Sequence, residues 1–248
     1  MEPFEYAVAS GFDAFEWFPD KKPDAGWDER DLSPAMRRSI RETAAAQGIR
    51  QSVHARLQGD PLQEEARPML DADLQFAVDL GAALLNIHLS HEASLAVFLH
   101  AIAPLAQRTA AAGLQLSIEN TPRHTPEDFN ELFLRLRLLD SVPTGHIGMC
   151  LDIGHANLCS ATQNNYLEFL DQLDPQVPIT HLHLHENWGD ADSHLPLFTG
   201  PAAEDDSGIR ELAKRLRHRG FSGSIILEQW PHPPALLHQA KERLRQLF

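Results

Sequence analysis

The sequence predicts one α/β domain over residues 1–248, a (β/α)8 barrel of which seven strands are recognisable. Three observations lead to this prediction. A chain of 248 residues has the length of one such barrel, which takes up roughly 250 residues. Short apolar runs alternate with helical patterns along the whole chain, as they do in parallel α/β folds. In addition, each apolar run has a carboxylate or a histidine at its last or penultimate position.

Seven segments have the composition of buried parallel strands. Each is short, mostly apolar and bounded by turn residues. They are residues 12–17, 50–54, 83–88, 114–119, 147–152, 179–184 and 224–228.

The segments between these strands carry helix signals. Thr125 and Pro126 precede two acidic residues, which is the pattern of an N-cap followed by a first turn that favours negative charge. Apolar residues recur with helical spacing over residues 209–216. Four glycines fall where a helix must stop before the next strand: Gly48, Gly81, Gly113 and Gly220. The repeat is typical of a βα barrel, although an open doubly wound sheet has the same local rhythm.

The polar residues near the strand ends favour the barrel. In chain order they are Glu16, His54, His88, Glu119, Asp152, His183 and Glu228. The carboxyl ends of parallel strands lie on one side of a sheet, so closure brings all of these groups to one mouth. An open sheet spreads seven strand ends over roughly 30 Å, at about 4.8 Å per strand.

The same residue types predict a metal site. Imidazole and carboxylate groups together suit Zn²⁺, Mn²⁺, Fe²⁺ or Co²⁺, and buried carboxylates need the positive charge that such an ion supplies. His155, Asp192 and His194 extend the set. One histidine or glutamate at a strand end is more often structural, but its repetition on successive strands favours a metal. We therefore expect a divalent-metal site, with Mn²⁺ or Zn²⁺ as the ion.

Two further histidines on the sixth strand and just after it receive other roles. His181 is interpreted as a buried core residue, and His185 as a group that supports the ligands rather than as a ligand.

Composition disfavours several classes of partner. The 21 basic and 35 acidic residues give a net charge of −14, which is unfavourable for binding nucleic acid or an anionic membrane surface. The two cysteines cannot form a disulfide framework, and no apolar run approaches the length of a membrane span. The N-terminal segment also has no signal-peptide pattern. We expect a cytoplasmic protein with a small-molecule partner, and leave a homodimer open.

The ordered motifs resemble a known superfamily. They are Val53-His54, Ile87-His88, Glu119-Asn120-Thr121, Leu151-Asp152-Ile-Gly-His155, His183-Leu-His-Glu186, Asp192-Ser-His194 and Leu227-Glu228. Together they resemble the xylose isomerase-like TIM-barrel superfamily, which contains sugar-phosphate isomerases and epimerases, inosose dehydratase and endonuclease IV. The resemblance covers nearly the whole chain. Members of the superfamily open with a strand, whereas residues 2–10 have the pattern of the first helix, so we expect the first strand to be missing.

The resemblance implies two alternative ligand sets. The ketose epimerase branch implies one divalent ion held by Glu119, Asp152, His183 and Glu228, with the two glutamates as the acid/base pair. The endonuclease IV branch implies three ions with nine ligands. By resemblance these are His54, His88, Glu119, Asp152, His155, His183, Asp192, His194 and Glu228.

The leading hypothesis is a divalent-metal-dependent sugar or sugar-phosphate isomerase or epimerase, which transfers a proton through an enediolate by means of Glu119 and Glu228. The expected substrate-binding residues are Glu16, Asn120, His155, Trp188 and Arg56. The alternative is a phosphoesterase with two or three ions, related to endonuclease IV. A third hypothesis is a barrel remnant that binds metal or ligand without turnover.

Overall fold

The computed structural model describes residues 2–22, 25–90, 93–139, 142–229 and 233–248. Two compact units can be distinguished. Unit 1 comprises Met1–Ile118 and Leu134–Gly148, and unit 2 comprises Glu119–Phe133 and Met149–Phe248. The single domain expected over residues 1–248 stays a prediction.

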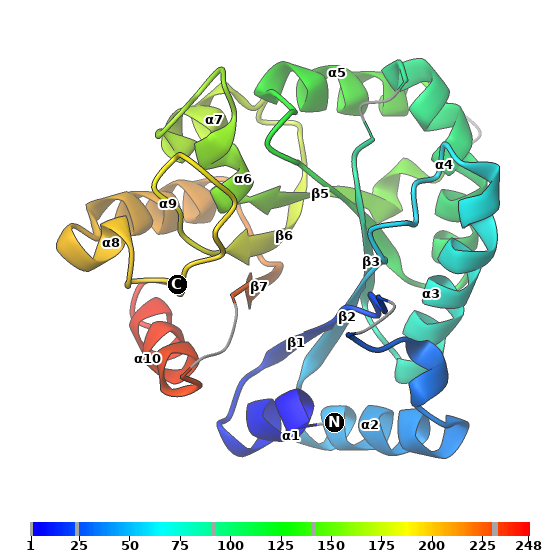
Figure 1. The fold of residues 1–248 in the computed structure, drawn as a ribbon. Helices are drawn as coiled ribbons and strands as arrows, with labels where there is room; N and C mark the ends of the chain where they lie inside the picture. Colours follow the sequence, from blue (N-terminus) through cyan, green and yellow to red (C-terminus); the bar gives the residue numbers. More distant parts are fainter. Residues whose placement is uncertain (1, 23–24, 91–92, 140–141, 230–232) are drawn as a thin grey trace. The chain divides into compact units, whose positions relative to one another are not determined.

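Unit 1 contains the first four strands, in chain order within the sheet (Figure 1). They are β1 (Ala14–Trp17), β2 (Arg50–His54), β3 (Leu84–His88) and β4 (Gln115–Glu119), whose last residue belongs to unit 2. Strand β2 pairs in parallel with both β1 and β3. The segments that the sequence predicts as strands are therefore strands. Residues 12 and 13 are an exception, because the Phe12 N–H donates to the Ala7 carbonyl and still belongs to the end of the preceding helix.

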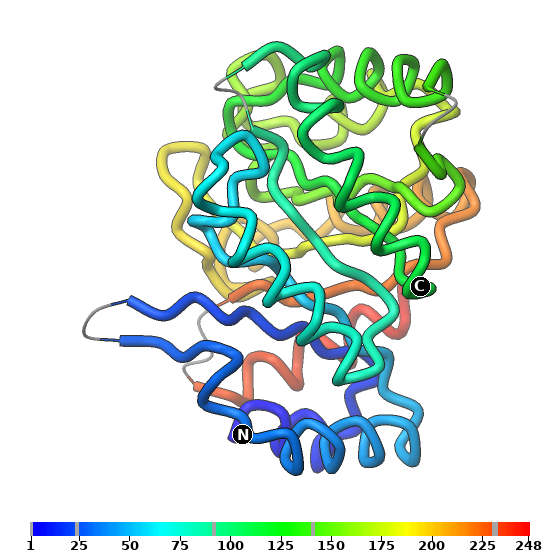
Figure 2. The backbone as a smooth tube through the Cα atoms, turned by 90° about the vertical axis from the view of Figure 1, so that its right-hand side faces the viewer, coloured from blue at the N-terminus to red at the C-terminus, as the bar shows by residue number. Residues whose placement is uncertain are grey.

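The helices of unit 1 are α1 (Glu2–Ala9), α2 (Pro34–Gln47), α3 (Arg67–Leu80) and α4 (Leu95–Ala111), with the 3-10 turns η1 (Glu29–Asp31), η2 (Glu64–Ala66) and η3 (Thr144–His146). The last three helices end at or just before Gly48, Gly81 and Gly113, as predicted. The Ser33 hydroxyl caps α2 by accepting the Met36 N–H. Gly48 ends α2 with φ of 68°, a left-handed conformation that glycine adopts without steric cost. Helices α2 and α3 pack against each other and against β2 (Figures 1 and 2).

Unit 2 contains the last three strands, also in chain order: β5 (Ile147–Asp152), whose first two residues belong to unit 1, β6 (Ile179–Leu184) and β7 (Ser224–Leu227). Asp152 is in register with His183, and Leu184 with Leu227. Strand β7 ends one residue earlier than expected, although the Glu228 N–H still donates to the Leu184 carbonyl. The last residues of all three strands therefore lie at one edge of the sheet.

The helices of unit 2 follow these strands. They are α6 (Ile153–Leu158), α7 (Tyr166–Gln172), α8 (Pro201–Glu204), α9 (Ser207–His218) and α10 (Ala235–Leu244), while α5 (Pro126–Arg137) begins in unit 2 and ends in unit 1. The apolar face predicted for residues 209–216 is confirmed, because Ile209, Leu212, Ala213 and Leu216 are buried. Among the described residues, no helix combines the length and the apolar character that a membrane crossing requires.

Candidate metal centre

Four side chains at strand ends of unit 2 converge on one point. Glu119 ends β4, Asp152 ends β5, His183 is the penultimate residue of β6, and Glu228 follows β7. One ligand atom from each lies within 4.8 Å of those of the other three. We call this group site A. Three of its side chains are fully buried, while the Glu228 side chain is 29% exposed.

The distances within site A suit a single divalent ion. His183 Nδ1 lies 2.8 Å from Glu228 Oε2, 3.4 Å from Glu119 Oε2 and 3.8 Å from Asp152 Oδ2. Zinc bonds of about 2.0–2.2 Å place neighbouring ligand atoms of a tetrahedral site about 3.3–3.5 Å apart. Asp152 Oδ2 is buried and makes no hydrogen bond with any described residue. Three carboxylates beside one imidazole need a further positive charge, so these residues fit a divalent cation.

Asn120 and the first turn of α6 position Asp152. The Asn120 Nδ2 donates to the Asp152 carbonyl and its Oδ1 accepts the Asp152 N–H, both at 2.9 Å. Asp152 Oδ1 accepts the His155 N–H at 2.7 Å and so caps α6. Burial opposes ionisation of Asp152, but the nearby His155 and His185 hold its pKa below the ordinary value. The structure thus uses the Asn120 amide to orient Asp152, whereas we expected it to bind a substrate hydroxyl.

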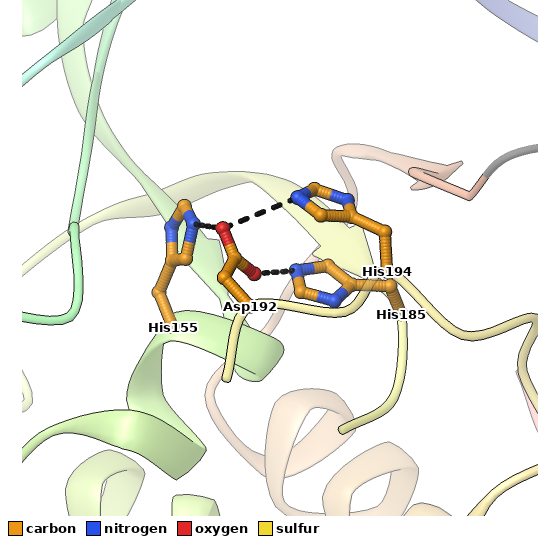
Figure 3. A group of neighbouring side chains, drawn as sticks. All are labelled: His155, His185, Asp192 and His194. Carbon is orange, nitrogen blue, oxygen red and sulfur yellow. Dashed lines mark hydrogen bonds and ion pairs between the residues drawn. The ribbon is translucent and has the colours of Figure 1, made fainter. Parts of the chain in front are cut away.

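A second group of potential ligands comes from α6 and from the segment that follows β6. It consists of His155, His185, Asp192 and His194, whose ligand atoms again lie within 4.8 Å of one another (Figure 3). We call this group site B. Asp192 is at its centre. Its Oδ2 lies 3.2 Å from His155 Nε2 and 3.3 Å from His194 Nε2, and its Oδ1 lies 3.8 Å from His185 Nε2.

Backbone carbonyls orient two of the site B imidazoles. The His155 Nδ1–H donates to the Asn120 carbonyl at 2.8 Å, and the His194 Nδ1–H donates to the Glu228 carbonyl at 2.9 Å. When Nδ1 carries the proton, Nε2 presents a lone pair, and this is the usual support for a metal-bound histidine. Both rings therefore direct Nε2 towards Asp192. His155 Nδ1 is also 3.4 Å from Glu119 Oε1, so site B adjoins site A.

Without an ion, protons balance the charge of site B. Burial opposes charging of both histidines, but Asp152 and Asp192 hold the pKa of His155 well above its ordinary value. Asp192 and Glu228 outweigh burial at His194 and raise its pKa to about 9. Burial also disfavours the Asp192 anion, yet the bonds from His155 and His194 bring its pKa below the ordinary value. A cation at this point would replace those protons.

The segment that carries Asp192 and His194 is anchored by Glu186. The backbone of Glu186 exchanges hydrogen bonds of 3.0 and 2.9 Å with that of Leu195. Its buried carboxylate accepts the N–H groups of Phe198 and Gly200, both at 2.7 Å. His194 has φ of 45°, a left-handed conformation that costs energy for a residue with a side chain. Glu186 therefore joins the two ends of the segment that carries Asp192 and His194.

The sequence did not predict that His185 belongs to site B. We expected it to support the ligands, and the structure brings its ring into site B. The signal was the strand period of two, because His181, His183 and His185 share one face and the alternation continues one residue beyond β6.

Four of the predicted site residues belong to unit 1: Glu16, His54, Arg56 and His88. The rings of His54 and His88 are 4.8 Å apart, and the His54 Nδ1–H donates to the Ala55 carbonyl. Glu16 is half-buried in β1. Arg56, expected to bind substrate, is only 13% exposed, and its guanidinium bonds Asp73 and Glu29 at 2.6 Å each.

Trp188 lies beside a pocket of unit 2. It is 55% exposed and lines a cavity of about 240 Å³ together with Tyr166, Asn157, Glu186 and one side of His185. Its expected role in substrate binding stays a prediction.

Comparison with protein families identifies the chain. The model of the family described as xylose isomerase-like TIM barrel matches residues 4–247. The chain belongs to this family. Its fold class is therefore the α/β TIM barrel, as predicted, and the described residues hold seven strands instead of eight.

Individual relatives of this xylose isomerase-like chain are distant. An uncharacterised protein of Methanocaldococcus jannaschii is 29% identical over 123 residues, which are 47% of this chain and span only 37% of that protein. The solved structure of a D-tagatose 3-epimerase-like protein matches with a TM-score of 0.70 and 22% identity, covering 95% of this chain and 90% of the other. Endonuclease IV from Thermus thermophilus matches with a TM-score of 0.69 and 23% identity, covering 99% and 94%. At these identities the two structures show a common fold.

Proposed function

We propose that the protein is a divalent-metal-dependent isomerase or epimerase of a ketose or ketose phosphate, with its chemistry at site A. The observation that carries this proposal is the convergence of Glu119 and Glu228 with Asp152 and His183 within 4.8 Å. The fold shared with a D-tagatose 3-epimerase-like protein supports it.

The side chains of site A suggest how the reaction proceeds. A divalent cation held by these four side chains would supply Lewis acidity to the substrate carbonyl. One of the two glutamates takes the proton from the carbon beside the carbonyl, and the other returns a proton to the enediolate. Glu228 is partly exposed, whereas Glu119 is fully buried, so Glu228 is the carboxylate that meets solvent and incoming substrate. Asn120 keeps Asp152 aimed at the site.

Deuterium wash-in tests this proposal. The protein, loaded with Mn²⁺ or Zn²⁺, is incubated in deuterated water with a panel of free and phosphorylated ketoses, and deuterium at the carbon beside the carbonyl is followed by NMR. We expect exchange with at least one sugar. We also expect Glu228→Gln to slow it by about 10²–10⁴-fold, the usual contribution of an acid/base group. Glu204→Gln, at an exposed position on α8, is the matched control and should exchange at the wild-type rate.

Metal-dependent cleavage of phosphate esters without exchange on any ketose would overturn the proposal. This alternative, a phosphoesterase with two or three ions, is favoured by one observation. Site B adjoins site A, and the fold is also that of endonuclease IV. Cleavage of simple phosphomonoesters and phosphodiesters during a zinc titration tests it. Among phosphoesters we rank DNA last, because a chain with net charge −14 repels the duplex at long range. Nicking of DNA with abasic sites at moderate salt would reverse that ranking.

The remaining expectations concern the protein's setting. A small-molecule substrate, a cytoplasmic location and a homodimer stay proposals, each open to direct measurement.

A further inference from the structure

We infer that His185 is the fourth protein ligand of a metal ion at site B, which makes that ion a closed, structural one. The inference rests on the metal-dependent function proposed above and assigns separate tasks to the two sites. Site A keeps the reaction, and the ion at site B fixes the segment between β6 and α8.

The first argument is the state of the His185 ring. His185 is 1% exposed, and neither of its ring nitrogens makes a hydrogen bond within the described part of the chain. A buried imidazole without a hydrogen-bonding partner is costly, and native structures rarely leave one. Its Nε2 points towards Asp192, together with His155 and His194 (Figure 3). A cation bound there would accept the lone pair of Nε2.

The second argument is the geometry of the set. The distances of 3.2 and 3.3 Å from Asp192 Oδ2 to His155 Nε2 and His194 Nε2 match the edge of a zinc tetrahedron, about 3.3 Å for bonds of about 2.0–2.1 Å. His185 Nε2 lies 3.8 Å from the other Asp192 oxygen, which is longer than such an edge, so this imidazole must shift towards the other three ligand atoms to bind the same ion. Three imidazoles and one carboxylate are ligands that zinc accepts.

The third argument is that the surroundings hold the His185 ring in place. It stacks on the His194 ring with centroids 4.0 Å apart and planes inclined by 12°. On another side it contacts the backbone of Gly154, where a Cβ atom would lie 2.0 Å from His185 Cε1. The missing side chain of Gly154 therefore leaves a space, and the imidazole of His185, just after β6, fills it. Such confinement is expected of a ligand whose position matters.

Four protein ligands have a chemical consequence. A tetrahedral ion with four protein ligands has no open position for water or substrate, which distinguishes structural from catalytic zinc. An ion at site B would then neither generate hydroxide nor polarise a substrate. This favours the isomerase over a phosphoesterase that uses the same ion to activate water.

The rival interpretation is that His185 supports site A. Its Nε2 lies 3.2 Å from Asp152 Oδ1, close enough to donate to that carboxylate if the ring turns its N–H that way. In that case His185 would influence the ion at site A, and water would complete site B. The two interpretations predict changes at different ions.

Crystals of the wild-type protein grown with zinc decide between them without any variant. An anomalous difference map should show a peak about 2.0–2.1 Å from His185 Nε2 and from one atom each of His155, Asp192 and His194. A peak at site B that lies beyond bonding distance of His185, with water as its fourth ligand, would overturn the inference. So would an empty site B at saturating zinc while site A is filled.

Zinc affinities of variants give a second measurement. His185→Asn is compared with His124→Asn, which replaces another buried histidine of unit 2 that belongs to neither site. Asp192→Asn and Glu228→Gln identify which ion belongs to site B and which to site A. A lost ligand should weaken the site B ion by more than about 100-fold, beyond the roughly 10–100-fold typical of supporting partners. The site A ion and His124→Asn should stay within about threefold of wild type. Weakening of the Glu228-dependent ion instead would favour the rival interpretation.

Substitution with Co²⁺ adds a spectroscopic readout. Tetrahedral Co²⁺ absorbs visible light far more strongly than five- or six-coordinate Co²⁺, so the Asp192-dependent band should be intense in wild type and weak in His185→Asn. These readouts need no turnover. An intact four-ligand site B without ketose exchange would sink the proposed reaction but leave the inference standing, and exchange with an open site B would do the reverse.

Discussion

At the scale of single residues, each side chain near the two sites has two polar atoms, and the hydrogen bond of one atom determines where the other points. His155 and His194 each give one ring nitrogen to a backbone carbonyl and present the other to Asp192. Asn120 uses both ends of its amide on the backbone of Asp152. The first arrangement presents a ring nitrogen that suits a cation, and the second orients a carboxylate residue of site A.

Protons and metal should compete for site B. Nearby carboxylates raise the pKa of His194 to about 9 and that of His155 well above its ordinary value, which favours the doubly protonated, charged form of both rings without metal. Zinc binding should therefore release more than one proton per site B ion, and zinc affinity should rise with pH up to about 9. A titration in weak buffer with an indicator dye measures the release. Affinity that is constant between pH 7 and 9 would contradict the assignment.

The same shift affects the metal-free protein. The folded pKa of His194 is raised from 6.5 to about 9, so its ion pair with Asp192 adds stability in full below about pH 6.5. That contribution is lost as the pH rises through about 9.

Residue chemistry and chain position indicated candidate ligands more readily than the partners of other charged groups. Glu119, Asp152 and His183 were identifiable because an ionisable group that ends a buried strand needs a compensating charge, which a metal ion provides. Arg56 was not, since its partners Asp73 and Glu29 are 17 and 27 residues away in the chain. Only folding brings Arg56 close to these two carboxylates, so no local sequence pattern predicts the contacts.

At the scale of elements, the segment between β6 and α8 depends on Glu186 more than on regular structure. One carboxylate there accepts two backbone N–H groups at 2.7 Å and joins both ends of the segment. Asp192 and His194 are displayed between those ends.

Replacing Glu186 should loosen this segment. In Glu186→Gln, one acceptor oxygen becomes an NH₂ group, so at least one buried backbone N–H faces another donor. We expect unfolding free energy to fall by about 1–3 kcal/mol, the cost of an unsatisfied buried polar group. We also expect faster hydrogen exchange at Phe198 and Gly200. Denaturant unfolding and exchange mass spectrometry measure the two effects. Glu168→Gln, at an exposed position on α7, should change neither, and equal behaviour of both variants would refute this role.

The sequence predicted regular elements well and short ones poorly. Continuous apolar runs identified the seven strands, because strands buried on both faces leave little room for polar residues. The six-residue α6 and the four-residue α8 gave no comparable pattern. Asp152 caps α6, and Glu186 accepts an N–H from Ala202 in α8, so side-chain contacts with the backbone form them.

At the scale of the whole molecule, the metal sites should contribute to stability. Site A alone gathers three carboxylates in a chain that already carries a net charge of −14. Removing bound cations leaves that repulsion uncompensated.

Chelation should therefore lower the melting temperature. At free zinc of about 100 times Kd, one bound ion adds about 2.7 kcal/mol, and each kcal/mol shifts the melting temperature of a chain of this size by about 2–4 °C. We expect EDTA to lower it by about 5–10 °C per ion and zinc to restore it. Calorimetry measures the shift, and a variant with both Asp192→Asn and Glu228→Gln should show almost none. Identical melting with and without chelator, in protein that holds no metal, would favour the barrel remnant without turnover.

Two sequence features predicted the fold of the whole chain: the alternation of strand and helix patterns, and the polar residues near the strand ends. Family membership confirms this fold. The division into two compact units was not anticipated, because it depends on which segments pack together and leaves no composition boundary in the chain.

Gly154 and His185 should vary together among homologues. Gly154 lies in α6 between Asp152 and His155, yet the space it leaves is filled by His185, the residue that follows β6. Any side chain at position 154 would displace that imidazole, so the two positions are free to vary only as a pair. Homologues that replace the glycine should also have lost the histidine, and with it the fourth ligand that separates a sealed ion from an open one.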